Sequence, residues 1–360
     1  MNRFVQGLFL VCLISISTSC FKPKIQVALL TKLDSGSIIG ISEMAAVKEF
    51  EQTHPSSPIQ VVPFDDGWDP IRTNEAYRVV RDKDIRFLIT SHTSTCAVEI
   101  ADDINQDKRL TIITGATTTK LNGRDDYILR IIPDANQEQH YIAEKIANLK
   151  PKRLLIVRDL SNSGYTIPAQ EAFLSELNKL SPLVRIQTVD FDANNLSLST
   201  FDPLFTSTPF DILYLLIGGY KNVAGNIAQY FYQFQQNSVI VFTPWMNNKE
   251  LLTSGGPALT QAIIPSLFPP RKEDPRIDDY MTSIETKFRL SPTIISLKVY
   301  QALELLHLAL NSGATTPEQA KTWLLSQKTI ETRLGPIFFD TYGESSSDYC
   351  FITNIPEEFK

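Results

Sequence analysis

Eight short apolar runs alternate with helical patterns along the chain, and this alternation limits the fold more than any other feature. The runs are Ile25–Leu30, Ile59–Phe64, Ile85–Thr90, Leu110–Ile113, Leu154–Val157, Val184–Val189, Ile212–Ile217 and Val239–Thr243. Several of them are apolar at almost every position, which is typical of parallel strands covered on both faces. The alternation of strands and helices therefore predicts right-handed parallel units and an α/β fold.

Apolar residues at helical spacing fill the intervals between these runs. One expected helix carries Ile142, Ile146 and Leu149 on a single face, and a longer one carries Ile295, Val299, Ala302, Leu306 and Leu310. Pro168 is expected to open a further helix as its first residue, because a proline fits the first helical position. The buried face of that helix would consist of Ala169, Ala172, Phe173, Leu177 and Leu180.

The chain is long enough for two packed domains, and its strands fall into two groups of four. A proline-rich stretch at 265–271 is expected to be a crossover, and it is followed by helices, a strand at 335–340, a turn at Tyr342–Gly343 and a last strand near 349–353. We therefore expect two Rossmann-like lobes with parallel sheets, joined by several strands. One lobe would contain residues 24–132 and 268–336, and the other residues 133–267 and 337–360. A ligand would lie in the cleft at the carboxyl ends of the sheets.

The first twenty residues have the features of an export signal. Arg3 is followed by an apolar run from Phe4 to Ile16 and then by small residues up to Cys20. The run is shorter than the about 20 residues that a membrane-spanning helix needs. A cysteine directly after Ser19 favours lipidation of Cys20 and a bacterial lipoprotein anchored in the periplasm or at the cell surface. Ordinary cleavage near Ser19 is the alternative.

Composition and motifs exclude several classes of protein. A formal net charge of −6 and a pI near 5.4 argue against a nucleic-acid binder. The four histidines (His54, His92, His140 and His307) are scattered without the spacing of metal ligands. No nucleophile elbow, phosphate-binding loop or dinucleotide motif is present, so we expect no catalysis and no cofactor. The acidic pairs Asp65–Asp66 and Asp125–Asp126 are expected to be solvated loop residues.

Two cysteines, Cys96 and Cys350, lie in the body of the chain. An exported protein could form a disulfide between them, since the compartment is oxidising. The sequence does not show whether their Cα atoms come within bonding range, and two free thiols are an equal alternative.

Hydroxyl side chains follow two neighbouring strands at the point where each strand ends. Residues 90–95 read Thr-Ser-His-Thr-Ser-Thr and lead into a helix, and residues 114–119 read Thr-Gly-Ala-Thr-Thr-Thr. Hydroxyls and free backbone N–H groups at a helix start suit a carboxylate or another small anion. The alternative is that these side chains only cap their own helices. Two such loops after adjacent strands favour a ligand site.

Four segments together resemble the type I periplasmic substrate-binding proteins, in the leucine/isoleucine/valine-binding group of branched-chain amino-acid ABC transporters. They are the serine-rich loop at 91–95, the Gly-Ala-Thr segment at 115–117, the Leu-Ile-Gly-Gly-Tyr segment at 216–220, and the Gly-x-x-x-Phe-Asp-x-x-Gly hairpin at 335–343. The order and spacing of these segments across more than 300 residues carry the resemblance. It implies a monomeric two-lobed clamp that closes on a small ligand and delivers it to a permease.

The resemblance also implies roles for individual residues. The ligand-binding candidates are His92, Thr93, Ser94, Ala116, Thr117, Tyr165, Gly219 and Trp245. Thr93 or Ser94, with Ala116 and Thr117, would hold a ligand carboxylate. The family usually has an acid that pairs with the ligand's ammonium where this chain has Trp245, and an aromatic residue where it has Ile217. A standard α-amino acid is therefore not expected, and Trp245 could instead stack on an aromatic or apolar ligand, cover a cation, or pack between the lobes.

Two other classes of function remain as alternatives. The departures at Ile217 and Trp245 would also fit a clamp that has lost its ligand and binds a protein partner in the cell envelope as a structural or regulatory lipoprotein. An α/β enzyme is disfavoured, because the sequence lacks a nucleophile, metal or cofactor motif.

Overall fold

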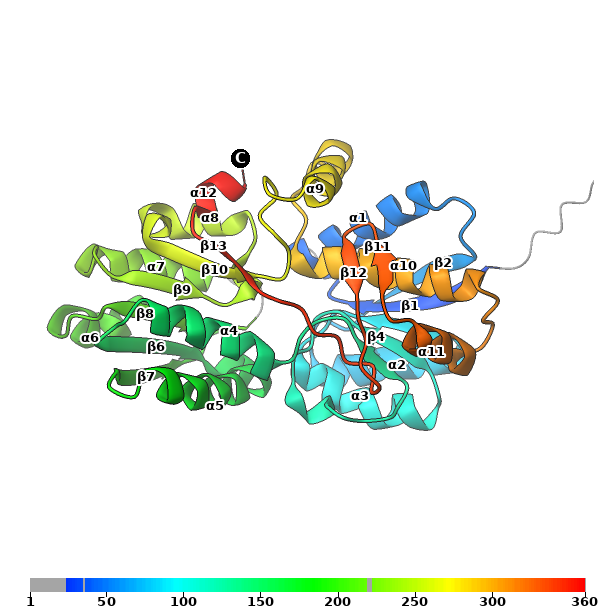
Figure 1. The fold of residues 1–360 in the computed structure, drawn as a ribbon, viewed down its shortest axis with the longest axis horizontal. Coiled ribbons are helices and arrows are strands. Elements are labelled where there is room, and N and C mark those ends of the chain that lie inside the picture. The colour runs from blue at the N-terminus through cyan, green and yellow to red at the C-terminus, as the bar shows by residue number, and fades with distance from the viewer. Residues whose placement is uncertain (1–23, 35, 219–221, 360) are drawn as a thin grey trace, which may run out of the picture.

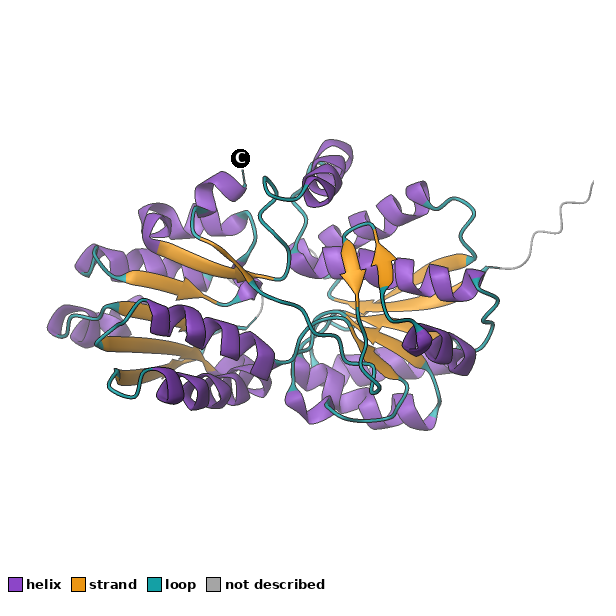
Figure 2. Cartoon of the chain, in the orientation of Figure 1, coloured by secondary structure: helices purple, strands orange, loops and turns teal. Residues whose placement is uncertain are grey.

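The computed structural model describes residues 24–34, 36–218 and 222–359. The protein consists of two lobes side by side, each with a twisted sheet covered by helices on both faces (Figures 1 and 2). The predicted signal segment with Cys20, and Gly219 of the predicted site, lie outside the described residues. None of the helices that the structure describes is both long and apolar enough to cross a membrane.

The sheet of the first lobe is parallel and has the strand order β2-β1-β3-β4-β5. Its strands are β1 (Ile25–Thr31), β2 (Ile59–Asp65), β3 (Phe87–Thr90), β4 (Leu110–Ile113) and β5 (Ile128–Arg130). Its helices are α1 (Ile38–Thr53), α2 (Pro70–Asp82), α3 (Ser94–Gln106), α9 (Pro275–Phe288), α10 (Ile294–Asn311) and α11 (Pro317–Ser326). Val27 to Leu30 are completely buried, as expected of a strand covered on both faces.

The sheet of the second lobe has the order β13-β10-β9-β8-β6-β7, and only the edge strand β13 is antiparallel to its neighbour. The strands are β6 (Arg153–Asp159), β7 (Arg185–Phe191), β8 (Ile212–Leu216), β9 (Val239–Phe242), β10 (Ala262–Ser266) and β13 (Cys350–Ile352). The helices are α4 (Ala135–Asn148), α5 (Ser163–Leu180), α6 (Asp202–Ser207), α7 (Val223–Phe234), α8 (Glu250–Gly255) and α12 (Ile355–Glu358).

The described chain passes between the lobes between β5 and α4, between β10 and α9, and between the hairpin β11 (Ile330–Thr332)–β12 (Gly335–Ile337) and β13 (Figure 1). Arg130, at the end of β5, holds the first and third of these passages together. Its side chain is 1% exposed. Nε donates to the Glu344 carboxylate at 2.6 Å, and Nη1 donates to the Thr118 carbonyl at 2.6 Å. Ser345 N donates to the Arg130 carbonyl at 2.9 Å, so the returning segment runs beside β5.

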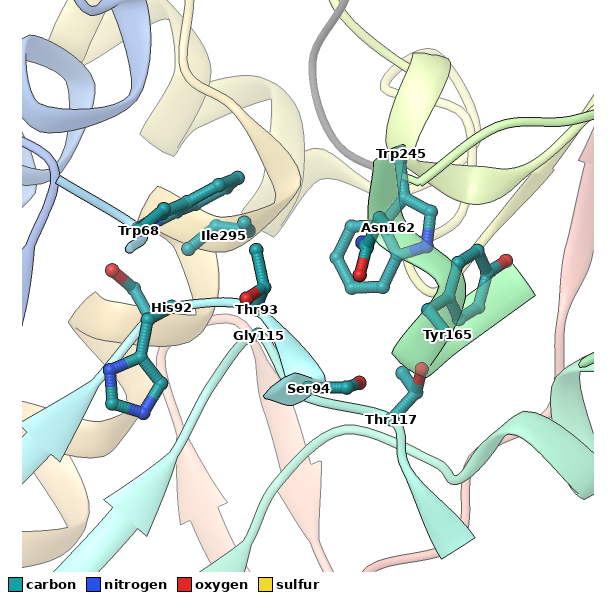
Figure 3. A pocket seen from close by; sticks show the side chains of 11 residues that line it. Trp68, His92, Thr93, Ser94, Gly115, Thr117, Asn162, Tyr165, Trp245 and Ile295 are labelled. Atoms are coloured by element: carbon teal, nitrogen blue, oxygen red, sulfur yellow. The ribbon is translucent and has the colours of Figure 1, made fainter. Parts of the chain in front are cut away.

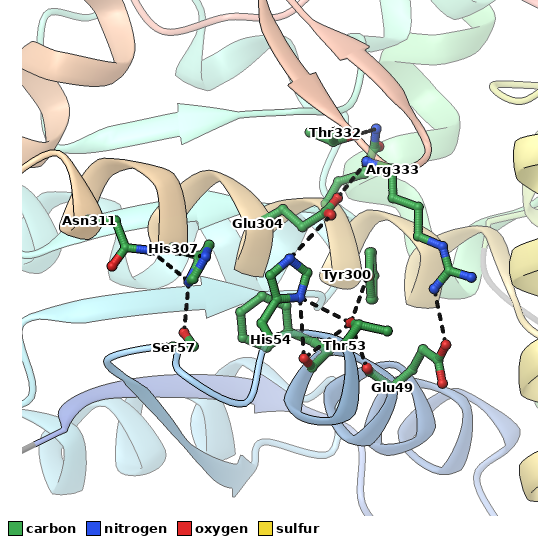
Figure 4. A network of polar contacts seen from close by, with 12 residues as sticks. Glu49, Thr53, His54, Ser57, Tyr300, Glu304, His307, Asn311, Thr332 and Arg333 are labelled. Atoms are coloured by element: carbon green, nitrogen blue, oxygen red, sulfur yellow. Dashed lines mark hydrogen bonds and ion pairs between the residues drawn. The ribbon is translucent and has the colours of Figure 1, made fainter.

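A polar network fastens α1, α10 and the β11–β12 hairpin to one another (Figure 4). Arg333 donates to Glu49 at 3.0 Å, and its backbone N–H donates to Glu304 at 2.9 Å. Burial raises the pKa of Glu304 to about 7. The hydroxyls of Thr53 and Tyr300 are 3.1 Å apart. These bonds hold α10 rigidly in the first lobe, and the start of α10 borders the cleft.

The structure confirms the two-lobed α/β fold and all eight predicted strand regions. Three of the described strands, β5, β10 and β11, were not predicted. The proline-rich stretch from Pro265 was expected to be a crossover, but Pro265 lies in β10. Only the first two residues of β10 pair with β9, and Pro265 follows them, opposite the antiparallel strand β13. The prediction for Pro168 was wrong, because α5 begins at Ser163 and Pro168 lies inside it. Leu149 and Leu180, which were expected on the apolar faces of α4 and α5, are both exposed.

The alternative of two free thiols is the one that the structure supports. Cys96 lies in α3 of the first lobe and Cys350 in β13 of the second, and neither forms a disulfide within the described part of the chain.

Candidate functional site

The carboxyl ends of both sheets face a small pocket between the lobes (Figure 3). About 280 Å³ of space not occupied by atoms lies within the pocket and at its open mouth. Its lining consists of Trp68, Ser91, His92, Thr93, Ser94, Gly115, Thr117 and Ile295 from the first lobe, and Asn162, Tyr165 and Trp245 from the second. Loops after β2, β3 and β4 and the start of α10 form the first wall. The start of α5 and the turn after β9 form the second.

The first wall is rich in hydrogen-bond donors. Thr93 is the N-cap of α3, but its side chain makes no capping hydrogen bond, so the first N–H groups of this helix are not satisfied by it. Thr117 is 1% exposed, and within the described chain its hydroxyl has no partner. Gly115 brings the two loops together, because a Cβ there would lie 2.3 Å from the Ser91 carbonyl oxygen.

Trp68 enters the pocket from a tight turn after β2. Gly67 and Trp68 both have positive φ angles, 59° and 57°. This left-handed backbone conformation is unusual for a bulky residue such as tryptophan. The carboxylates of Asp65 and Asp66 hold the turn, since Gly67 N donates to Asp65 at 3.1 Å and Trp68 N donates to Asp66 at 3.0 Å. The strained conformation thus directs an indole ring to the ligand side of the sheet.

A buried ionisable cluster lies behind the first wall. His92 Nδ1 is 2.8 Å from Asp66, and both side chains are almost completely buried. Figure 3 shows the His92 ring turned away from the pocket. Burial raises the pKa of Glu43 to about 8, opposed by the nearby hydroxyls of Thr31 and Ser91. The expectation of solvated acids at 65–66 was wrong for Asp66, which is 0% exposed, and Asp126 is also buried.

The second wall is aromatic. The ring of Tyr165 meets the Trp245 indole edge to face, with centroids 6.0 Å apart and planes at 90°. The Tyr165 hydroxyl donates to the buried Glu138, and Gln139 Nε2 donates to the same carboxyl at 2.8 Å. Burial raises the pKa of Glu138 to about 7. Tyr165 is therefore fixed by a carboxyl behind the wall and presents its ring to the pocket.

The two lobes touch at the edge of the pocket. Gly164, in the first turn of α5, has no room for a side chain, because a Cβ would lie 2.4 Å from Oγ1 of Thr95 in α3. This close approach shows a closed arrangement of the lobes. Any larger residue at position 164 would keep α3 and α5 further apart.

The structure brings six of the predicted site residues together: His92, Thr93, Ser94, Thr117, Tyr165 and Trp245. Ala116 is completely buried in the first-lobe core and its side chain does not line the pocket, where Gly115 lies instead. His92 lines the pocket, but its ring bonds Asp66 instead of donating into the cleft. Sequence reasoning did not find Trp68, Asn162 or Ile295.

The pocket has little charge of its own. Among its described lining residues there is no Asp, Glu, Lys or Arg, and the imidazole ring of His92 is turned away. In the described part of the chain, no group of three or more His, Cys, Asp or Glu side chains could hold a metal ion. The arrangement can bind and enclose a small molecule through hydroxyls, backbone N–H groups and aromatic faces.

Comparison with known families agrees with this geometry. The family described as "Periplasmic binding protein" matches residues 34–355. The chain belongs to the periplasmic binding protein family. The predicted resemblance to the leucine/isoleucine/valine-binding group of type I periplasmic binding proteins is confirmed.

Individual periplasmic binding proteins are similar over most of the chain. The Leu/Ile/Val-binding protein BraC3 of Rhizobium johnstonii is 25% identical over 289 residues, which are 78% of this chain and 75% of that protein. The leucine-binding protein LivK of Thermotoga maritima superposes with a TM-score of 0.81 at 17% identity, covering 91% of this chain and 94% of that one. A solute-binding protein from Rhodopseudomonas palustris, in complex with 3,4-dihydroxybenzoic acid, has a TM-score of 0.80 at 16% identity, with 91% and 92% covered.

Proposed function

We propose that this protein is an extracytoplasmic solute-binding lipoprotein that captures a small carboxylate or amide in the cleft and delivers it to the permease of an ABC transporter. The observation that carries the proposal is the pocket between the lobes. On one side it has the start of α3 and the Thr117 hydroxyl, which has no partner among the described residues. Unpaired N–H groups and the helix dipole favour a negative group there. The protein acts as a monomeric clamp, without catalysis.

Relatives support a ligand of this kind. The Rhizobium protein is named for leucine, isoleucine and valine, and the Rhodopseudomonas protein contains 3,4-dihydroxybenzoic acid. These molecules differ in shape and charge, but each has a carboxylate. Lobe closure would enclose the ligand, with residues 24–132 and 268–336 moving as one body against 133–267 and 337–360.

The lipid anchor is a separate part of the proposal. Residues 1–20 direct export, and a diacylglyceryl group on Cys20 holds the protein at a bacterial membrane in the periplasm or at the cell surface. Metabolic labelling with a fatty acid, followed by comparison with Cys20→Ser, tests this step. Label on the parent chain and none on the variant is the expected result, and equal labelling would contradict it.

A thermal-shift screen of the purified chain tests ligand capture. The panel contains amino acids, aromatic acids, amides, nucleosides and small carboxylates. A ligand at about 100 times its Kd stabilises the folded chain by roughly 2.7 kcal/mol, which is easily measured. The expected result is a hit that weakens in Thr117→Val.

A clamp without a ligand, acting on a protein partner of the envelope, is the second candidate. It is supported by Ile217, which is completely buried and stands where the family has a ligand-contacting aromatic residue. A cooperative melt with no hit across the panel would favour this alternative.

A further inference from the structure

Resting on the proposed solute-binding function, we propose that the ligand is an aromatic monocarboxylate without an ammonium group. Its ring lies between Trp68 of the first lobe and Trp245 of the second, and its carboxylate faces the start of α3 and Thr117. The pocket is thus specialised against zwitterionic amino acids. Three features of the lining support this assignment.

The first feature is the lack of a counter-charge for an ammonium group. No acidic side chain lines the described part of the pocket. The buried acids behind its walls do not line it. Asp66 contacts His92 at 2.8 Å, and Glu138 accepts from Tyr165 and Gln139. Glu43 is completely buried, which raises its pKa to about 8 and favours its neutral form. Burying an ammonium group without a partner is strongly unfavourable, so the closed protein would bind a zwitterion more weakly than an acid without an ammonium.

The second feature is the aromatic surface on both sides of the cleft. Two of the chain's three tryptophans line this one small pocket, one from each lobe. Trp68 reaches it only through a turn with two consecutive positive φ angles, 59° and 57°, which the Asp65 and Asp66 carboxylates stabilise. Backbone strain of this kind is retained where the side chain it presents is used. Ile295 adds an apolar surface beside Trp68 (Figure 3).

The third feature is the donor set at the opposite end. Thr117 is 1% exposed, lines the pocket, and has a hydroxyl with no partner in the described chain. It lies near Ser94 and the start of α3, where the Thr93 side chain does not cap the helix (Figure 3). A carboxylate would accept hydrogen bonds from these groups, which suits one negative group at one end of the ligand.

Trp245 and Tyr165 contact each other edge to face, so they form one wall and not an open cage around a cation.

Matched ligand pairs test the charge requirement on the unmodified protein. Calorimetry compares 3-phenylpropanoate with L-phenylalanine, which adds only the ammonium, and benzoate with cyclohexanecarboxylate, which lacks only the aromaticity. We expect 3-phenylpropanoate to bind about 100-fold more tightly than L-phenylalanine, because the ammonium would be buried unpaired. Benzoate should bind several-fold more tightly than cyclohexanecarboxylate, since only a planar ring stacks on indole.

Tryptophan variants test the placement of the ring. Trp68→Leu and Trp245→Leu should each weaken benzoate binding about tenfold, and the Phe variants should retain most of it because they keep an aromatic face. Trp323, in α11 and outside the pocket, is the matched control, and its replacement by leucine should leave the Kd unchanged. Thermal melts check that each variant folds, and the ligand pairs above need no variant.

The outcomes separate this inference from the proposed function. L-phenylalanine or leucine binding as tightly as the acids without an ammonium would overturn the inference and leave solute capture intact. Tight binding of glycine betaine would likewise overturn it, since the tryptophans would then recognise a cation. A folded protein that binds no member of these pairs or of the wider panel would overturn both.

Discussion

The two walls of the pocket are built from different chemistry. The first-lobe wall presents hydroxyls and helix N–H groups, and the second-lobe wall presents the rings of Tyr165 and Trp245. The exceptions are Trp68 and Ile295 in the first wall and the amide of Asn162 in the second. The difference indicates that the first lobe binds the polar end of a ligand and that the second lobe covers its apolar part. A clamp divided in this way binds tightly only when both lobes are in place.

The walls are alike in one respect, because each has a buried carboxyl behind it. Burial raises the pKa of Glu43 to about 8 behind the first wall and that of Glu138 to about 7 behind the second. Glu138 is held by Tyr165 and Gln139, whereas Glu43 lies near Asp66, whose charge raises its pKa further. The first wall is therefore expected to be the more sensitive to alkaline pH.

The largest expected effect is on the pH dependence of stability. The folded-state pKa of both acids exceeds the ordinary value of 4.5, so the folded chain keeps protons that the unfolded chain releases. The free energy of unfolding should therefore fall as pH rises, from pH 4.5 to about 8 for Glu43 and to about 7 for Glu138. The losses are on the order of 5 and 3 kcal/mol. Urea unfolding at pH 5 and pH 9 measures them.

Neutral variants separate the two contributions. Glu43→Gln should be more stable than the parent at pH 9 and similar at pH 5, and Glu138→Gln should show the same difference at a smaller size. Glu51→Gln in α1 and Glu144→Gln in α4 replace exposed acids on the same two helices and serve as controls. A parent-like pH profile in Glu43→Gln would show that this carboxyl does not stay protonated in the folded state.

Separating the walls should have the next largest effect. Gly164→Val places a side chain where a Cβ alone would lie 2.4 Å from Thr95 Oγ1, and the two valine methyl groups extend further, so we expect the lobes not to approach fully. If the closed state falls to about 1% of the population, the apparent Kd rises about 100-fold. Calorimetry with the best ligand from the screen measures the affinity, and small-angle scattering shows whether the liganded protein stays open.

The neighbouring residue provides the control for this variant. Ser163→Val adds the same side chain at an exposed position in the same helical turn, and we expect no change in affinity. Parent affinity in Gly164→Val would mean that ligand binding does not require the contact between α3 and α5.

A smaller effect is expected from removing one donor of the first wall. Thr117→Val keeps the shape of the side chain and deletes the hydroxyl that has no partner in the described chain. A hydrogen bond to a charged group contributes about 1.5–3 kcal/mol, so affinity for a carboxylate should fall roughly 10- to 100-fold. Thr119→Val, in the short helix after this loop and outside the pocket, is the control. Unchanged binding in Thr117→Val would place the carboxylate elsewhere.

The difference between the two walls also explains how much of the site could be predicted from the sequence. The hydroxyls of the first wall follow strands whose apolar runs are easy to recognise, and parallel strands bring their carboxyl ends to one edge. Thr93, Ser94 and Thr117 therefore could be placed together. Trp68 could not, because its position depends on a positive-φ turn held by Asp65 and Asp66.

The fold was predictable for a similar reason. The central strands give continuous apolar runs, whereas β5 has only three residues and β10 contains Pro265; both end at passages between the lobes. Pro265 is tolerated because β9 no longer pairs with β10 at that point, which is a property of the assembled sheet. The burial of Asp66 and Glu138 likewise depends on partners far away in sequence, such as His92 and Tyr165.

The smallest expected effect concerns the hydroxyl of the second wall. Figure 3 shows the Tyr165 ring beside the pocket and its hydroxyl on the far side, where it donates to Glu138. Tyr165→Phe should therefore change ligand affinity less than about threefold, since the ring surface remains. It should lower the free energy of unfolding by about 1 kcal/mol through the lost hydrogen bond. If the variant instead binds as weakly as Thr117→Val, the second wall also contributes a polar contact, and the division between a polar and an aromatic wall would have to be abandoned.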